Sequence, residues 1–227
     1  MIKKNFIEVI ICKNTHEIPD SIFEKLCSLL SIEKQKIIKK FRFKKDANNS
    51  LISDLIIRCK AKECLNLQND NMTFLANKFG KPFLVGYPSF QYNVSHSGNC
   101  VAVSFSNKPI GIDIELINHI EINSFRSVLA KEELDYILSS VDKIKRFYEI
   151  WTKKESYIKL KGISLVDMPF LNVLEISLDN PVFYYLVFHS NKYMVHTCSY
   201  IPEKPKTKII TITDLLKKIQ VFYEVRI

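Results

Sequence analysis

The segment from Ile110 to Ile117 alternates apolar and polar residues more regularly than any other part of the chain: Ile-Gly-Ile-Asp-Ile-Glu-Leu-Ile. Neighbouring side chains of a strand point to opposite faces, so this alternation predicts a strand with one buried face. The buried face would carry Ile110, Ile112, Ile114 and Leu116. The opposite face would present Gly111, Asp113 and Glu115.

Apolar residues at helical spacing predict several helices. We expect them over residues 20–30, 32–41, 46–65, 131–138 and 142–161, with a short helix after a cap at Thr213. The buried stripe of the longest would consist of Leu51, Leu55, Ile56, Cys59 and the stem of Lys62. In the helix over 142–161, the core-facing residues would be Phe147, Ile150, Trp151, Ile158 and Lys154, whose stem would snorkel toward solvent.

Shorter apolar runs predict strands over residues 6–12, 90–95, 101–105, 173–178, 182–189, 192–200, 208–212 and 221–227. The strands over 90–95, 101–105 and 110–117 would form a three-stranded meander. The segment Asn107-Lys108-Pro109 is the expected seam between two halves, 1–107 and 108–227. Each half would pack helices on a small, mostly antiparallel sheet, which gives an α+β fold class.

Composition agrees with a globular chain: 227 residues, of which 47% are hydrophobic. The apolar runs are too short and too often interrupted by charge to span a membrane. The N-terminal residues superficially resemble a signal peptide, but Glu8 interrupts the apolar run and no small-residue cleavage site follows. We therefore expect a first strand there and a cytoplasmic protein.

The six cysteines show no C-x-x-C spacing. Without a secretion signal they are expected to be reduced thiols, several of them in apolar surroundings, with neither a zinc site nor a disulfide framework. The net charge of +9 favours an anionic partner. Charge alone leaves open nucleic acid, a phosphorylated small molecule, an acidic protein and a membrane surface.

Two carboxylates on the predicted strand are the first candidate site. Asp113 and Glu115 would lie roughly 7 Å apart at the backbone, given about 3.3 Å rise per residue. Like charges this close repel unless a cation lies between them, and Mg²⁺ prefers carboxylate oxygens. The simpler interpretation of this pair alone is a half-exposed strand with an acidic outer face.

A second candidate lies on the predicted helix over 142–161. Trp151, Glu155 and Lys159 are spaced i, i+4, i+8 and so share a stripe. Taken alone, Glu155 and Lys159 form an ordinary helix-stabilising pair. Beside a strand with two carboxylates, they supply the further carboxylate and the ammonium needed to hold Mg²⁺ and a phosphate together. His96, in a Gly-containing turn, is either a structural histidine or a donor to a phosphate oxygen.

Four blocks, in this order, resemble the 4′-phosphopantetheinyl transferase superfamily, in its surfactin-type branch. The blocks are Phe79-Gly-Lys-Pro82, Asn93-Val-Ser-His-Ser-Gly98, Ile110-Gly-Ile-Asp-Ile-Glu115 and Trp151-Thr-Lys-Lys-Glu-Ser-Tyr-Ile-Lys159. A fainter block over residues 33–47 is similar to the family's N-terminal region. Any one block is a weak signal, but the third followed some forty residues later by the fourth is specific.

The resemblance implies transfer of phosphopantetheine from coenzyme A to a serine of an apo acyl, peptidyl or polyketide carrier protein, with release of adenosine 3′,5′-bisphosphate. It also implies a monomer of two similar, pseudo-twofold-related α+β halves with coenzyme A between them. Mg²⁺, or Mn²⁺ in its place, would be held by Asp113, Glu115 and Glu155. The transfer itself would involve Glu155 as base, directly or through a metal-bound water, together with Lys159 and His96. Coenzyme A would contact Lys34, Ser50, Gly80, Lys81, Pro82, Ser95, His96 and Lys159, and residues 121–138 would shape the carrier contact.

Some positions depart from the family pattern. Ile37 stands where a second lysine is frequent, with Lys36 or Lys40 as substitutes. Asn48-Asn49-Ser50 replaces a triplet with a 3′-phosphate arginine, and Ser50 would keep the hydroxyl contact. The segment after Lys159 is also shorter than usual. These departures concern coenzyme A binding rather than the metal and transfer residues.

Two other functions stay open on the sequence. A non-catalytic homologue would bind coenzyme A or a carrier protein without transfer. A metal-dependent phosphohydrolase or nucleic-acid binder would fit the charge and the carboxylates and would show salt-sensitive binding to DNA or RNA. No nucleic-acid fold signature or aromatic-basic stripe supports the latter, so we expect no nucleic acid and no membrane partner.

Overall fold

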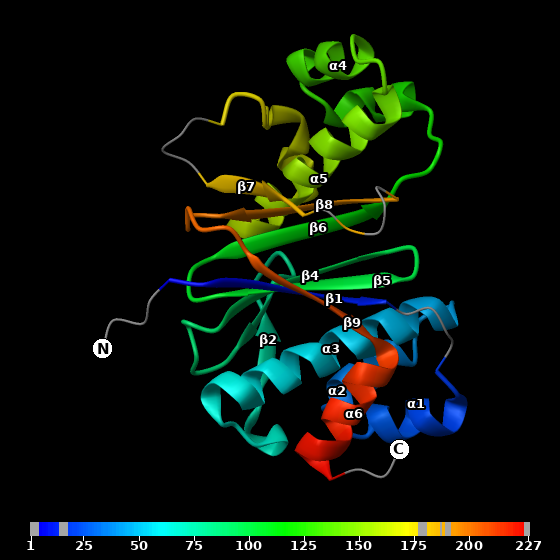
Figure 1. The fold of residues 1–227 in the computed structure, drawn as a ribbon, viewed down its shortest axis with the longest axis vertical. Helices are drawn as coiled ribbons and strands as arrows, with labels where there is room; N and C mark the ends of the chain where they lie inside the picture. Colours follow the sequence, from blue (N-terminus) through cyan, green and yellow to red (C-terminus); the bar gives the residue numbers. More distant parts are fainter. Residues whose placement is uncertain (1–4, 14–17, 177–180, 187, 189–191, 225–227) are drawn as a thin grey trace.

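A computed structural model describes residues 5–13, 18–176, 181–186, 188 and 192–224. Figure 1 shows four layers: helices, a sheet, a second sheet and further helices. The strands are β1 (Ile7–Lys13), β2 (Phe74–Ala76), β3 (Pro82–Leu84), β4 (Gln91–Ser97), β5 (Cys100–Ser106), β6 (Ile110–Leu116), β7 (Val182–Tyr185), β8 (Tyr193–Ser199) and β9 (Lys206–Thr211). The helices are α1 (Asp20–Cys27), α2 (Ile32–Ile38), α3 (Lys44–Leu65), α4 (Lys131–Leu138), α5 (Lys143–Lys161) and α6 (Ile212–Tyr223), with short 3₁₀ helices η1 (Asn69–Asn71), η2 (Ile122–Val128) and η3 (Leu165–Phe170). The α+β class is confirmed.

The predicted three-stranded meander is wrong in its third strand. The first sheet has the order β4-β5-β1-β9, and β6 lies in a second sheet with the order β6-β8-β7. A strand has two edges, and those of β5 are taken by β4 and β1, both antiparallel to it. β6 instead pairs antiparallel with β8, which comes much later in the chain. Alternation along β6 predicted its faces correctly but held no information about its neighbours.

Helices cover the outer face of each sheet, and the inner faces pack against each other. Helices α1, α2, α3 and α6 lie below the first sheet in Figure 1, while α4 and α5 lie above the second. The predicted stripe of α3 is confirmed, since its apolar members Leu51, Leu55, Ile56 and Cys59 are all buried. Between the sheets, the apolar contact is made by Val9, Ile11, Ala102, Ile112, Ile114 and Val195. This packing fixes how the two sheets sit on each other.

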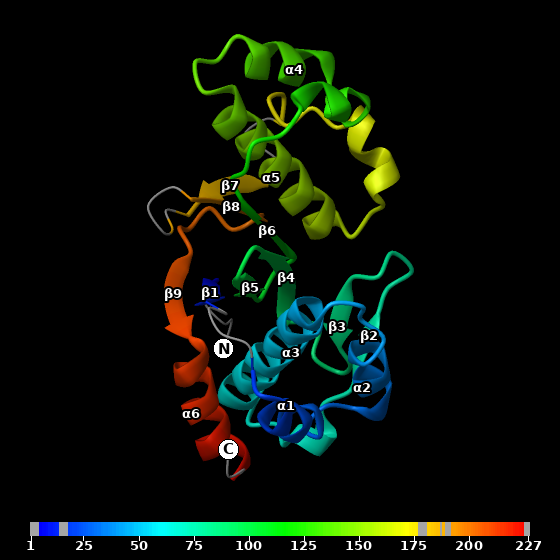
Figure 2. The ribbon, with the colours of Figure 1, turned by 90° about the vertical axis from the view of Figure 1, so that its right-hand side faces the viewer.

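The C-terminal residues return to the first sheet. β9 pairs in parallel with β1, and α6 then packs against α3 (Figures 1 and 2). The predicted strand over 221–227 is therefore wrong for its described part, because the helical spacing of Leu215, Ile219 and Phe222 carries α6 to Tyr223. The division at 107/108 and the similarity of the two halves stay predictions.

Three smaller expectations also change. The helix cap is Thr211 rather than Thr213: the Thr211 hydroxyl accepts from the Asp214 amide, and the Asp214 carboxylate accepts from the Thr211 amide. In the predicted strand over 173–178, residues 173–176 form a turn instead, and residues 177 and 178 lie outside the described part of the chain. The strand expected over 182–189 is observed as Val182–Tyr185, with residues 187 and 189 outside the described residues.

All six cysteines are free thiols, and only Cys64 is exposed. Within the described ranges, no helix combines the length and apolar character that a membrane crossing requires.

The prediction that Lys154 extends toward solvent is wrong, because its side chain is fully buried on α5. Its ammonium donates to Glu133 Oε2 at 2.6 Å and to the carbonyl of Leu171. The Glu133 carboxylate also accepts from the amides of Ala130 and Val173, at 2.9 and 2.8 Å. The buried carboxylate explains why the ammonium stays inside: α4, α5 and the segment after η3 meet at this ion pair.

Replacing Glu133 by alanine should strongly destabilise the protein. It would leave the Lys154 ammonium buried and unpaired, at a cost of about 3–5 kcal/mol. Urea unfolding followed by circular dichroism measures this free energy. The control is Asp135→Ala, an exposed side chain on the same helix, which should change it by no more than about 0.5 kcal/mol. A Glu133→Ala protein as stable as the control would contradict this role of the pair.

Candidate active site

Helix α5 lies directly on the face of β6 that carries Gly111, Asp113 and Glu115. A Cβ atom at Gly111 would lie 1.9 Å from the carbonyl oxygen of Ser156, which no side chain tolerates. Asp142 caps the start of α5 by accepting from the Lys145 amide, and Gly162 ends it in a left-handed conformation. The close approach at Gly111 therefore brings the second half of α5 down onto β6.

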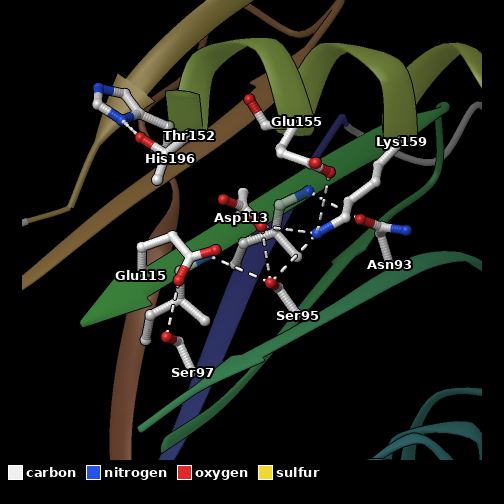
Figure 3. A network of polar contacts seen from close by, with 12 residues as sticks. Asn93, Ser95, Ser97, Asp113, Glu115, Thr152, Glu155, Lys159 and His196 are labelled. Atoms are coloured by element: carbon white, nitrogen blue, oxygen red, sulfur yellow. Dashed lines mark hydrogen bonds and ion pairs between the residues drawn. The ribbon is translucent and has the colours of Figure 1, made fainter. Parts of the chain in front are cut away.

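Asp113, Glu155 and Lys159, here called the acid–lysine cluster, meet in this contact (Figure 3). The Lys159 ammonium donates to Asp113 Oδ1 at 2.6 Å and lies 3.9 Å from Glu155 Oε2. The helix acid and the strand acid thus lie on either side of one ammonium, and their joint binding of a metal ion stays a prediction. Glu115, the other strand acid, accepts from the Ser97 hydroxyl at 2.8 Å.

Burial makes Glu115 and Glu155 harder to ionise. Burial and the nearby Asp113 charge raise the pKa of Glu115 to about 7, against opposition from Ser97, Lys159 and Trp151. Burial also raises the pKa of Glu155, although the Lys159 charge opposes it. Excess negative charge in a buried setting is the electrostatic problem that a bound cation relieves.

Some features of the cluster oppose a bound metal ion and others favour it. Among the described residues, no three His, Cys, Asp or Glu side chains are arranged to hold a metal ion. Lys159 lies between the two carboxylates of the cluster. However, Asp113 Oδ2 is buried and accepts no hydrogen bond from the described residues, and an unused carboxylate oxygen is the ligand that Mg²⁺ prefers. In its chemistry, though not in its described geometry, the donor set therefore fits a hard cation.

A cavity of about 280 Å³ opens beside the acid–lysine cluster. One wall is the turn Phe79-Gly80-Lys81-Pro82 with Asn93 and Val94, and the other consists of Glu155, Ile158, Lys159, Gly162 and Ile163 on and after α5. The predicted residues Gly80, Lys81 and Pro82 are thus brought next to Glu155 and Lys159. A small ligand held by this turn would have its far end at the cluster.

Lys81 has a structural task in addition to lining the cavity. Its ammonium donates to the carbonyls of Ile110 and Leu160, at 3.1 and 3.0 Å. Burial lowers its pKa to about 8. The charge thereby links the turn after β2 to the start of β6 and the end of α5, and the stem and backbone of Lys81 remain to face a ligand.

The remaining residues predicted to contact coenzyme A lie in different parts of the structure. Ser95 donates to Asp113 Oδ1 at 2.8 Å and so belongs with the cluster. His96 is exposed on the opposite face of β4, and partial burial and the Lys159 charge lower its pKa. Lys34 Nζ lies 3.8 Å from Asp54 Oδ2 on α3, and Ser50 is half-buried on α3. Neither Lys34 nor Ser50 is among the residues that line the described cavity.

Sequence reasoning did not assign a role to several residues that shape the site. Asn93 and Ser97 lie two residues on either side of Ser95, so the alternation rule applied to β4 would have found them on the same face. Thr152 on α5 and His196 on β8 form a buried pair, with 2.7 Å between Thr152 Oγ1 and His196 Nδ1 (Figure 3). Nothing in the sequence signals this last pair, because β8 was not expected to neighbour β6.

The family comparison agrees with this geometry. Residues 18–108 match the model described as "4′-phosphopantetheinyl transferase, N-terminal", and residues 109–213 match "4′-phosphopantetheinyl transferase superfamily". The chain belongs to the 4′-phosphopantetheinyl transferase superfamily. Its similarity to Sfp and gsp assigns it to the surfactin-type branch.

Three relatives illustrate the range of the similarity. The 4′-phosphopantetheinyl transferase gsp of Aneurinibacillus migulanus is 38% identical over 158 residues, which is 69% of this chain and 66% of gsp. Sfp of Bacillus subtilis is 33% identical over 63% of this chain and 64% of its own length. The mouse L-aminoadipate-semialdehyde dehydrogenase-phosphopantetheinyl transferase is 32% identical over 59% of this chain and 48% of its own length. The match thus spans less than two thirds of each relative.

We expect Gly111→Ala to destabilise the fold at the site. The added Cβ would force α5 away from β6, at about 3 kcal/mol or more. Gly86→Ala is the control, since a Cβ there meets nothing within 4 Å and adds only left-handed backbone strain, about 1–2 kcal/mol. Denaturant unfolding measures both. Equal losses for the two variants would argue against the close approach.

The raised pKa of Glu115 predicts a pH-dependent stability in metal-free protein. Folding raises this pKa from 4.5 to about 7, so its stabilising contribution is complete below pH 4.5 and is lost as the pH rises through 7. Glu115→Gln, which stays neutral, should exceed the wild type in unfolding free energy by about 1–3 kcal/mol near pH 8. The difference should nearly vanish at pH 4.5.

Urea titrations in the presence of a chelator provide the measurement. The control is Glu121→Gln, which changes an exposed carboxylate outside the cluster. A Glu115→Gln difference that does not change with pH would contradict the burial of an ionised Glu115.

Proposed function

We propose that this protein transfers the 4′-phosphopantetheine group of coenzyme A to a serine of an apo carrier protein and releases adenosine 3′,5′-bisphosphate. The observation that carries the proposal is the acid–lysine cluster at a cavity, in a chain of this family. The aligned relatives are named as transferases of this kind. Since part of each relative lies outside the match, the activity is inferred for this chain rather than carried over.

Asp113, Glu115 and Glu155 would hold Mg²⁺, or Mn²⁺ in its place. The support is the unused Asp113 Oδ2 and the raised pKa of both glutamates, which a divalent cation would reverse. When bound, the ion would offset the negative charge of the coenzyme A pyrophosphate.

In this type of transfer the protein mainly positions the reactants and neutralises developing charge. The carrier serine Oγ would attack the phosphorus that bears the pantetheine arm. As that P–O bond forms, the bond to the bridging pyrophosphate oxygen breaks, and adenosine 3′,5′-bisphosphate leaves with the electron pair. Glu155 would accept the serine proton, for which a carboxylate of raised pKa is suited. Lys159, released from Asp113, would neutralise the charge that builds on the leaving oxygen.

The cavity would receive the nucleotide end of coenzyme A. Gly80, Lys81 and Pro82 would contact adenine and ribose through backbone and stem, because the Lys81 ammonium is engaged by two carbonyls. Ser95 would contact a phosphate oxygen near the cluster, and His96, on the opposite face of β4, would contact another phosphate of coenzyme A. Lys34 and Ser50 would be nearer the 3′-phosphate, where Asn48 and Asn49 are only 2% exposed and so are poorly placed to substitute for an arginine.

The net charge of +9 suits an acidic carrier as well as coenzyme A. Fatty acid, polyketide and nonribosomal peptide carriers all remain open as partners. A cytoplasmic location, a monomeric state and a carrier contact over residues 121–138 also stay predictions.

Two substitutions in the cluster test the proposal. Glu155→Gln removes the proton acceptor and Lys159→Met removes the positive charge, so each should lower the rate of carrier modification by about 100-fold or more. Lys161→Met is the matched control on the same helix, because this exposed lysine contacts Tyr200 instead. Its rate should stay near that of the wild type.

The measurement is intact-mass spectrometry of a panel of apo carriers incubated with protein, coenzyme A and Mg²⁺. Full activity of Glu155→Gln would remove the proposed catalytic centre. If the wild type binds coenzyme A but adds no mass to any carrier, the chain is a non-catalytic binding homologue.

A further inference from the structure

Within the part of the chain that the structure describes, β6 is an edge strand with a backbone partner on one side only. That partner is β8. Amides along a strand point alternately to the two edges, so every second amide of β6 faces away from β8. These are the amides of Ile112, Ile114 and Leu116. An unpaired buried amide costs free energy, so each needs an acceptor.

The acceptors are side chains of the first sheet. Ile112 N donates to Asn93 Oδ1 at 2.9 Å, Ile114 N to Ser95 Oγ at 3.3 Å, and Leu116 N to Ser97 Oγ at 3.0 Å. Asn93, Ser95 and Ser97 lie at i, i+2 and i+4 on one face of β4, so their spacing matches the amides of β6. We call these three side chains the polar ladder; Figure 3 shows them beside the acid–lysine cluster.

The two serines do more than satisfy amides. A hydroxyl has one proton to donate and can accept two. Since Ser97 accepts from the Leu116 amide, its own proton points elsewhere, and it goes to Glu115 Oε2 at 2.8 Å. Ser95 likewise donates to Asp113 Oδ1 while accepting from Ile114 N and Lys159. The register between the sheets thereby sets the direction of both strand carboxylates.

Asn93 differs from the serines in a useful way. Its side-chain oxygen accepts from the β6 backbone, and its amide group makes no recorded contact with a carboxylate among the described residues. Asn93 therefore holds the strand, whereas Ser97 holds both the strand and Glu115. This difference separates a purely structural contribution from an effect on the carboxylate.

We propose that Ser97 is a positioning residue that holds Glu115 in the orientation needed for cation binding, with Asn93 fixing the β6 edge on which Glu115 lies. The proposal rests on the proposed function only for the identity of the cation and the reaction. Ser97 touches neither substrate nor reacting atoms in this role; it acts through Glu115. The proposal also predicts that β4 and β6 must be in register for the cation to bind.

The test is a Mg²⁺ titration of the thermal unfolding temperature without coenzyme A, using Ser97→Ala, Ser97→Thr, Ser97→Cys and Asn93→Ala. Ser97→Ala should raise the Mg²⁺ concentration at half-effect by about tenfold or more, as for other residues that orient a metal ligand. Ser97→Thr keeps the hydroxyl and should restore the wild-type value. Ser53→Ala, which removes a buried hydroxyl on α3, is the control and should leave that concentration unchanged.

A second readout separates positioning from general instability. Ser97→Ala should lower kcat for carrier modification more than it raises KM for coenzyme A, and excess Mg²⁺ should recover part of the loss. Asn93→Ala should lower the unfolding temperature at every Mg²⁺ concentration with a smaller change in half-effect. If Ser97→Ala fails to fold, Ser97→Cys, which preserves volume but donates weakly, should give an intermediate half-effect.

The outcomes distinguish this proposal from the proposed function. An unchanged half-effect for Ser97→Ala, or a wild type whose unfolding temperature does not respond to Mg²⁺, overturns the positioning role. A shifted half-effect in a protein that modifies no carrier supports the positioning role and rejects the transfer reaction.

Discussion

The contact between the backbones of α5 and β6 is the constraint on which the site depends. At Gly111 the strand and the helix are so close that a Cβ atom would overlap the Ser156 carbonyl. With any larger residue the helix would rise, and Glu155 and Lys159 would rise with it. Because packed interiors transmit such shifts rather than absorb them, a single missing side chain decides whether two distant segments share an ammonium.

The same contact brings charged side chains together in a buried region, where an ionised group is costly in free energy. Asp113 is almost fully buried, Glu115 and Glu155 have raised pKa values, and Lys159 offsets them only in part. A fold selected for stability alone would place apolar groups there. Elsewhere the protein treats buried charge differently: Glu133 and Lys154 form a complete pair whose remaining contacts are backbone groups. The incomplete balance at the cluster is therefore typical of a site that binds a ligand.

Among the residues that the structure describes, no backbone ladder joins the sheet β4-β5-β1-β9 to the sheet β6-β8-β7. Apolar side chains fill the space between them, and at the β4–β6 junction the polar ladder of Asn93, Ser95 and Ser97 supplies what strand pairing would otherwise provide. β9 and α6 add a second connection, since they follow β8 yet pack with the first sheet and α3. The site therefore lies where the two sheets meet, and its geometry depends on contacts from both.

The sequence by itself determined much of the local structure and the family to which the chain belongs. Strict alternation gave the faces of β6 and helical spacing gave α3 and α5, because these signals depend on nearest neighbours along one element. Asp113 and Lys159 lie on separate elements, so only the resemblance of their motifs to a known family pointed to a shared site. Tertiary structure alone decided that β6 pairs with β8 rather than β5, that Lys154 ends on a buried Glu133, and that the Lys81 ammonium binds two carbonyls. Those outcomes depend on which segments far apart in the chain meet, and the pattern along one strand or helix holds no information about its partner.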